Sequence, residues 1–132
     1  MFTDIEGSTA LLKRLGDRAY AEALSEHHGM IRAALASHGG KEISTQGDGF
    51  FAVFSSASAC ASGAIEMQRA FATHAWPAGT QVRVRTGVHC GEASETSTTG
   101  LVGFGIHRAA RVAAVAQRLS RSSWILRWRS PA

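Results

Sequence analysis

Apolar side chains recur along this chain at two spacings, and the change from one spacing to the other marks its elements. Intervals of three and four residues indicate helices, whereas strict alternation indicates strands. The pattern predicts a strand, a short helix, a long helix, a hairpin, a helix, a strand and a final helix of small residues. These elements cover, in order, residues 1–3, 8–15, 17–38, 42–54, 56–76, 81–89 and 106–116.

Local residue signals support these boundaries. Asp17 is a good N-cap for the long helix, and Gly39-Gly40 is a typical helix end. The Asp48-Gly49 pair favours a hairpin turn, and residues 94–100 have the composition of a polar loop. The strand at residues 81–89 alternates, which predicts one buried face and one solvated face. The buried face comprises Val82, Val84 and Val88, and the solvated face comprises Arg83, Arg85 and His89.

The order of elements predicts an α+β fold, a ferredoxin-like βαββαβ sheet with its helices on one face. In that topology the first strand lies beside the strands of the hairpin. The end of the first strand therefore faces the hairpin tip. Asp4 and Asp48 occupy these two places, so we expect their carboxylates to converge.

Two converging carboxylates repel each other unless a cation lies between them. Mg²⁺ and Mn²⁺ are commonly held by one or two carboxylates together with substrate phosphates. Residues Ile5 to Thr9 follow Asp4 directly and lead into a helix, whose first N–H groups favour an anion. The pair and the helix start together predict a nucleoside triphosphate site. Taken singly, Asp4 and Asp48 are better explained as a cap and a turn residue, whereas the pair meeting in one predicted sheet favours the site.

Composition and charge narrow the functional classes. A chain of 132 residues suits one domain. The net charge of +4 comes from Arg118, Arg121, Arg127 and Arg129, which all lie beyond residue 117. A nucleic-acid partner is therefore not expected, because its binding surface normally carries basic residues over one folded face. With two isolated cysteines, no membrane segment and no signal peptide, we expect an intracellular, cytoplasmic protein.

Four segments resemble the catalytic domain of class III adenylate/guanylate cyclases of bacterial type. They are FTDIEGST, GGKEISTQGDGFFAVF, VRVRTGVHCGEA and GFGIHRAARVA, and they occur in the family's order and spacing. The resemblance extends from Phe2 to about Ala116. The first segment alone is only moderately specific, because haloacid dehalogenase phosphatases open with a similar pattern.

The resemblance implies a homodimer with composite active sites at the subunit interface. One subunit would supply Asp4, Asp48 and the carbonyl of Ile5 to two Mg²⁺ or Mn²⁺ ions, and residues 5–9 to the phosphates. These phosphate-binding residues are Ile5, Glu6, Gly7, Ser8 and Thr9. The partner would supply Arg111 and, at the family's asparagine position, His107. The implied reaction converts ATP or GTP to a 3′,5′-cyclic nucleotide and pyrophosphate.

The sequence departs from the family pattern at the purine site and at its end. Ser44 and Gly100 stand where the family has a purine-reading lysine and aspartate, which predicts little discrimination between ATP and GTP. Thr45, Thr98 or Thr99 are candidates to compensate. We expect a partial cyclase domain over residues 1–116, followed by a basic, poorly ordered tail at 117–132 that resembles a frameshifted end.

Weak or lost activity is the expected consequence of these departures. A catalytically inactive cyclase-like domain that dimerises or binds nucleotide is the first alternative. A metal-dependent phosphatase is a distant second, because the second acidic motif of such enzymes is missing from the sequence.

Overall fold

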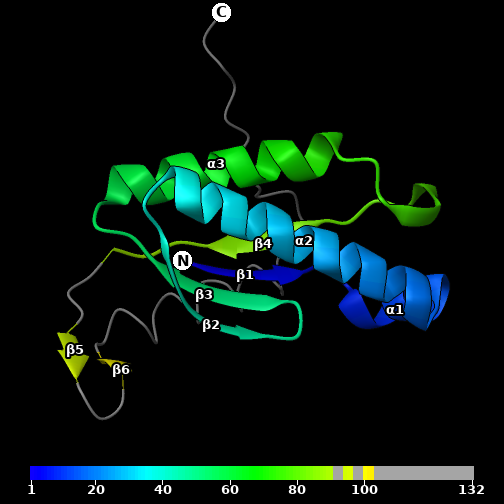
Figure 1. Ribbon diagram of the computed structural model, residues 1–132, viewed down its shortest axis with the longest axis horizontal. Coiled ribbons are helices and arrows are strands. Elements are labelled where there is room, and N and C mark those ends of the chain that lie inside the picture. The colour runs from blue at the N-terminus through cyan, green and yellow to red at the C-terminus, as the bar shows by residue number, and fades with distance from the viewer. Residues whose placement is uncertain (91–93, 97–99, 103–132) are drawn as a thin grey trace, which may run out of the picture.

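The computed structural model describes residues 1–90, 94–96 and 100–102. Four strands pair in one sheet, three α-helices and a 3-10 turn connect them, and two further strands form a separate small sheet (Figure 1). In chain order the elements are β1 (Phe2–Ile5), α1 (Ser8–Leu15), α2 (Asp17–Ser37), β2 (Lys41–Gln46), β3 (Gly49–Val53), α3 (Ala57–Thr73), η1 (Pro77–Gly79), β4 (Val84–Gly87), β5 (Ser94–Thr96) and β6 (Gly100–Val102).

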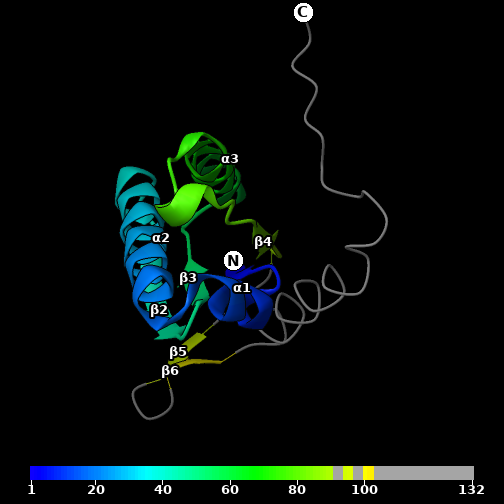
Figure 2. The ribbon, with the colours of Figure 1, turned by 90° about the vertical axis from the view of Figure 1, so that its right-hand side faces the viewer.

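The main sheet has the strand order β2-β3-β1-β4 and every pairing in it is antiparallel. Helices α2 and α3 cover one face of this sheet, and α1 lies at the end where β1 finishes (Figures 1 and 2). This arrangement confirms the predicted ferredoxin-like α+β class. It also confirms that the first strand lies beside the hairpin, since β1 pairs with β3.

The end of α1 and the two ends of α2 depend on glycine. Gly16 lies between α1 and α2 with φ of +76°, so Asp17 is the first helical residue and not the predicted N-cap. The C-terminus of α2 ends as predicted. Gly39 has φ of +65°, and the Gly40 N–H donates to the Leu35 carbonyl at 2.7 Å. That bond is the Schellman closure, which satisfies a carbonyl that the helix leaves unpaired.

Helix α3 begins in the serine-rich stretch, as predicted. The Ser56 hydroxyl accepts the Ala59 N–H at 3.1 Å and caps the helix. The core lies between this helix, α2 and the sheet, and its largest fully buried side chains are Phe50, Ile5, Ile31, Met67 and His27. Within the described ranges, no helix has the length and apolar content needed to cross a membrane.

Three strand predictions need correction. The strand predicted at residues 81–89 forms only over Val84–Gly87, and Val88 beyond it is 37% exposed instead of buried. The hairpin turns at Gly47 and Asp48, one residue earlier than predicted, because Gln46 pairs with Gly49. Part of the predicted polar loop is strand, since β5 pairs with β6. The predicted helix at 106–116 and the tail at 117–132 lie outside the described residues.

Candidate active site

Asp4 lies on β1 opposite Arg85 of β4 in the antiparallel register. The Arg85 guanidinium donates from Nε to Asp4 Oδ1 at 2.7 Å and from Nη2 to Oδ2 at 2.8 Å. The side chain of Arg85 is only 14% exposed, whereas that of Asp4 is 39% exposed. Both oxygens of Asp4 are therefore paired with a cation, in the fork geometry that makes arginine–carboxylate pairs strong.

Asp48 reaches the same end of β1 from the hairpin tip. Its Oδ2 accepts the Ile5 N–H at 2.8 Å, so the carboxylate lies against the residue that follows Asp4. The turn is possible because Gly47 has φ of +59°, which side-chain-bearing residues rarely adopt. Gly49 packs closely, since a Cβ there would lie 3.3 Å from the Gln46 carbonyl oxygen. The hairpin thus brings the second predicted carboxylate beside the first strand.

Helix α2 packs against the hairpin tip through His28. The His28 Nε2 lies 2.9 Å from the Gly47 carbonyl oxygen, and because a carbonyl only accepts, the ring donates. Tyr20, on the same helix, has a phenol whose pKa is raised by burial and by the negative charge of Asp48, against an opposing hydrogen bond with Ser8. The tip that carries Asp48 is therefore held by α2 as well as by β1.

His27, the neighbour of His28, is fully buried beneath the hairpin. Its ring stacks on Phe71 and meets Phe50 edge-on, with ring centroids 5.5 Å and 6.0 Å apart. Neither ring nitrogen has a hydrogen-bond partner in the described part of the chain. Burial and, to a smaller extent, the proximity of His28 lower the pKa of His27 to about 4, and Asp48 acts in the opposite direction. His27 is therefore a neutral core residue at neutral pH.

The predicted phosphate segment, Ile5 to Thr9, is only partly available to a ligand through its backbone. The Ile5 N–H is bonded to Asp48, and the Glu6 N–H donates to the Arg83 carbonyl at 2.8 Å. The N–H groups of Gly7, Ser8 and Thr9 donate to no described group, and no side chain caps α1. The anion-binding donors therefore reduce to these three at the helix start.

The purine-specifying positions lie on two different sheets. Ser44 is an exposed residue of β2, and Gly100 is the first residue of β6. Thr45 donates its hydroxyl to Glu42, which also accepts the fork of Arg32 at 2.8 and 3.0 Å. Arg32 and Thr45 together lower the pKa of Glu42 to about 2. The hydroxyl hydrogen of Thr45 is thus bonded to Glu42 and is not free to donate to a purine. Thr98 and Thr99 lie outside the described residues.

Two predicted site residues, Arg111 and His107, lie outside the described residues, so their positions stay predictions. Arg85 was missed, because strand alternation alone assigns it to a solvated face together with Arg83. The available signal was its place on the strand that pairs with β1, but register is needed to set it opposite Asp4. Among the described residues, no group of three or more His, Cys, Asp or Glu side chains could hold a metal ion. The candidate cation site consists of two carboxylates and a backbone carbonyl.

Comparison with known proteins agrees with this fold. A sequence model of the adenylate and guanylate cyclase catalytic domain matches residues 1–109. Receptor-type adenylate cyclase B of Leishmania donovani is 38% identical over 76 residues, which are 58% of this chain and 6% of that protein. The chain therefore spans a small part of this relative. These matches do not support the phosphatase alternative.

Solved structures show the same fold. An adenylate cyclase from Trypanosoma brucei, determined in its monomeric state, superposes with a TM-score of 0.75 at 26% identity, covering 85% of this chain and 65% of that one. The guanylate cyclase domain from Catenaria anguillulae, solved in complex with GTP, gives 0.73 at 20% identity, covering 86% and 69%. The fold is that of a nucleotide cyclase domain. The chain belongs to the adenylate and guanylate cyclase catalytic domain family.

Proposed function

We propose that this chain is a nucleotide cyclase domain that converts ATP or GTP to a 3′,5′-cyclic nucleotide and pyrophosphate in a homodimer. The observation that carries the proposal is the 2.8 Å bond from the Ile5 N–H to Asp48 Oδ2. This bond places the hairpin carboxylate at the end of β1, directly after Asp4. Family membership supplies the reaction type, and the two carboxylates supply the place for it.

The residues at the end of β1 suit Mg²⁺ or Mn²⁺. Asp4, Asp48 and the Ile5 carbonyl are oxygen donors, which hard divalent cations prefer. This position already accommodates a positive charge, because the Arg85 guanidinium pairs with both carboxylate oxygens of Asp4. When bound, two such ions would lower the pKa of the ribose 3′-hydroxyl and stabilise charge on the α-phosphate. A metal ion that binds Asp4 must compete with Arg85 or share the carboxylate with it.

The start of α1 orients the phosphate chain. The unpaired N–H groups of Gly7, Ser8 and Thr9 point from the positive end of the helix dipole. From the partner subunit, Arg111 would stabilise charge on the reacting phosphate and His107 would hydrogen-bond to ribose or phosphate. Positioning and electrostatics supply the rate enhancement, and little protein acid–base chemistry is needed.

Mixed variants test the composite site. Asp48→Ala removes the metal half of a site and Arg111→Ala removes the partner half, so each homodimer should be inactive. Random mixing gives about half heterodimers, each with one intact site out of two, so about a quarter of the wild-type activity should return. The assay measures cyclic nucleotide formed from Mn²⁺·ATP. If two folded variants restore nothing when mixed, the two-subunit site is wrong.

A second candidate is a catalytically inactive cyclase-like domain, and the residues at the purine positions favour it. Ser44 and Gly100 provide neither the charged donor nor the carboxylate acceptor of the family pattern. Active and inactive forms differ in turnover and not in binding. An inactive domain would bind ATP with Mn²⁺ and release no pyrophosphate over many hours.

A further inference from the structure

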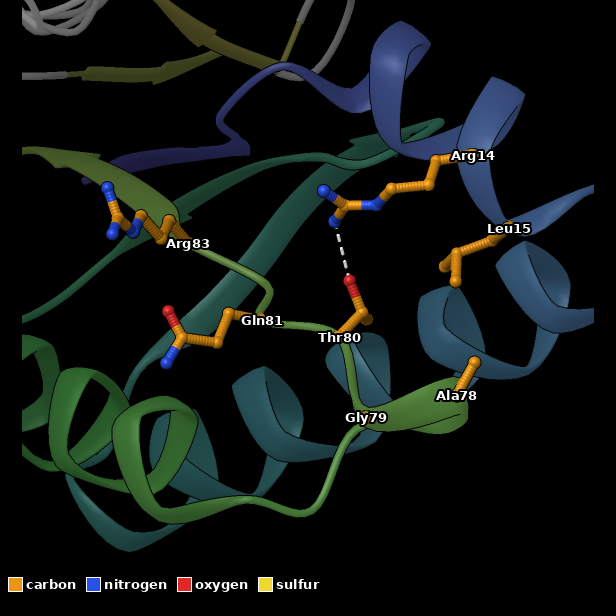
Figure 3. A pocket seen from close by; sticks show the side chains of 7 residues that line it. All are labelled: Arg14, Leu15, Ala78, Gly79, Thr80, Gln81 and Arg83. Carbon is orange, nitrogen blue, oxygen red and sulfur yellow. Dashed lines mark hydrogen bonds between the residues drawn. The ribbon is translucent and has the colours of Figure 1, made fainter.

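A polar cavity of about 560 Å³ lies between the end of α1 and the segment that leads from η1 into β4. Figure 3 shows its lining residues, Arg14, Leu15, Ala78, Gly79, Thr80, Gln81 and Arg83. Neither Asp4 nor Asp48 lines it. A smaller hollow of about 280 Å³ shares Arg14, Gln81 and Arg83 and continues along α1 to Gly7.

The charges in the larger cavity are unbalanced. Two arginines line it and no aspartate or glutamate does, while Glu6 lines the smaller hollow that shares Arg14 and Arg83. The Arg14 Nη2 donates to the Thr80 hydroxyl at 2.6 Å, which is an uncharged acceptor. The Arg83 side chain is exposed and forms no ion pair or hydrogen bond with another described residue. Two guanidinium groups that line one hollow, neither in an ion pair with a described carboxylate, favour an anionic ligand.

The wall opposite α1 is held in a fixed shape. Trp76, at its start, is buried and its Nε1 donates to the Phe71 carbonyl at 3.1 Å. Ala78 then takes a left-handed conformation, with φ of +55°, which costs an alanine about 1 kcal/mol. The Thr80 N–H closes the turn on the Pro77 carbonyl at 3.2 Å, and its hydroxyl is bonded to Arg14. The Thr80 hydroxyl of this wall is therefore held in place before any ligand arrives.

We propose that this cavity is an oxyanion site that takes a small phosphate-bearing molecule. Arg14 comes from α1, whereas Gln81 and Arg83 come from the segment across the cavity (Figure 3). A tetrahedral phosphate has oxygens for two guanidinium groups and for the Thr80 hydroxyl or the Gln81 amide at once, whereas a single carboxylate is satisfied by one fork. None of residues 5–9 lines this cavity, and the smaller hollow that adjoins it reaches Glu6 and Gly7 of the phosphate segment.

Binding of pyrophosphate in the presence of EDTA tests the proposal without the catalytic site, which requires divalent metal. The full chain, labelled with ¹⁵N, is titrated with inorganic phosphate and with pyrophosphate in 0.15 M NaCl, a roughly physiological ionic strength. We expect saturable shifts of the Thr80 and Gln81 amide signals at one ligand per chain. Arg14→Gln and Arg83→Gln should each weaken binding about tenfold, as expected for loss of one charge-assisted contact.

Arg18→Gln is the matched control, since it removes the same charge from a side chain that is 96% exposed and lies outside the cavity. It should leave the affinity unchanged. An equal loss in Arg18→Gln, shifts that never saturate, or shifts confined to residues 5–9 would each overturn the proposal. Succinate serves as the carboxylate arm, and binding as tight as that of pyrophosphate would contradict the assignment to phosphate. Arg14→Gln also removes the Arg14–Thr80 hydrogen bond, which supports the wall of the cavity. Arg83→Gln leaves that bond in place, so its loss of affinity reports on the ligand contact alone.

Discussion

Replacing His27 with phenylalanine tests the electrostatics of the core under the candidate site. The His27 side chain has no exposed surface, and both ring nitrogens lack partners among the described residues. Its pKa is about 4 in the folded chain, against an ordinary value of 6.5. Between pH 6.5 and about pH 4, His27 is therefore protonated in the unfolded chain and neutral in the folded chain.

The sign and size of the effect follow from this difference. The free energy of unfolding is highest above pH 6.5 and falls as the pH decreases towards 4, because protons favour the unfolded state in this window. A difference of 2.5 pKa units corresponds to about 3 kcal/mol over the whole window. At pH 5 the loss should reach about 2 kcal/mol.

Urea denaturation at pH 7.5 and at pH 5 measures this loss. His27→Phe keeps an aromatic ring between Phe50 and Phe71 and removes the titrating group. The free energy of unfolding of His27→Phe, relative to that of the wild type, should increase by about 2 kcal/mol on going from pH 7.5 to pH 5. Phe71→Leu is the control, because it weakens the same packing without a titrating group, and its cost should be equal at both pH values. If the difference in free energy of unfolding between His27→Phe and the wild type does not change with pH, the reasoning is refuted.

Three other changes probe the site itself. Arg85→Gln should tighten Mn²⁺ binding about fivefold, because it removes a partly exposed ion pair worth about 1 kcal/mol that competes for the same carboxylate; calorimetry would detect this. His28→Ala should speed hydrogen exchange of the Ile5 amide, whereas His28→Gln, which can still donate to the turn, should restore protection; equal exchange in both would contradict a holding role for His28. Ser44→Lys combined with Gly100→Asp should raise turnover of ATP relative to GTP by about ten- to a hundredfold. Strong purine selectivity in the wild type would show that other residues read the base.

The convergence of Asp4 and the hairpin tip was predictable, since it follows from the order of elements. In a βαββαβ sheet the first strand must pair with a hairpin strand, whatever the side chains are. The cap at Ser56 and the helix end at Gly39 were also predictable, because they depend on residues a few positions apart. Asp17 is not an N-cap because Gly16 is the single non-helical residue between α1 and α2. Gly16 therefore takes the N-cap position of α2.

Contacts set by strand register were not predictable. The Arg85–Asp4 pair requires β4 to align Arg85, and not Arg83, with Asp4, and periodicity carries no such information. Val88 was misplaced because alternation was extended past Gly87, where the strand ends. The use of the Ile5 and Glu6 N–H groups by Asp48 and Arg83 is likewise a tertiary effect. These contacts decide which backbone donors remain for phosphate.

The most direct test of the account is where Mn²⁺ binds. In an NMR titration of the full chain with ATP present, Mn²⁺ should first broaden the amide signals of Ile5 and Gly47, which lie beside Asp4 and Asp48. Asp4→Asn and Asp48→Asn should each weaken Mn²⁺ binding at least about tenfold. Asp17→Asn, a change of the same kind at the start of α2, should have no effect. Broadening elsewhere in the chain, or unchanged Mn²⁺ affinity in Asp48→Asn, would contradict the proposal that these two carboxylates form one cation site.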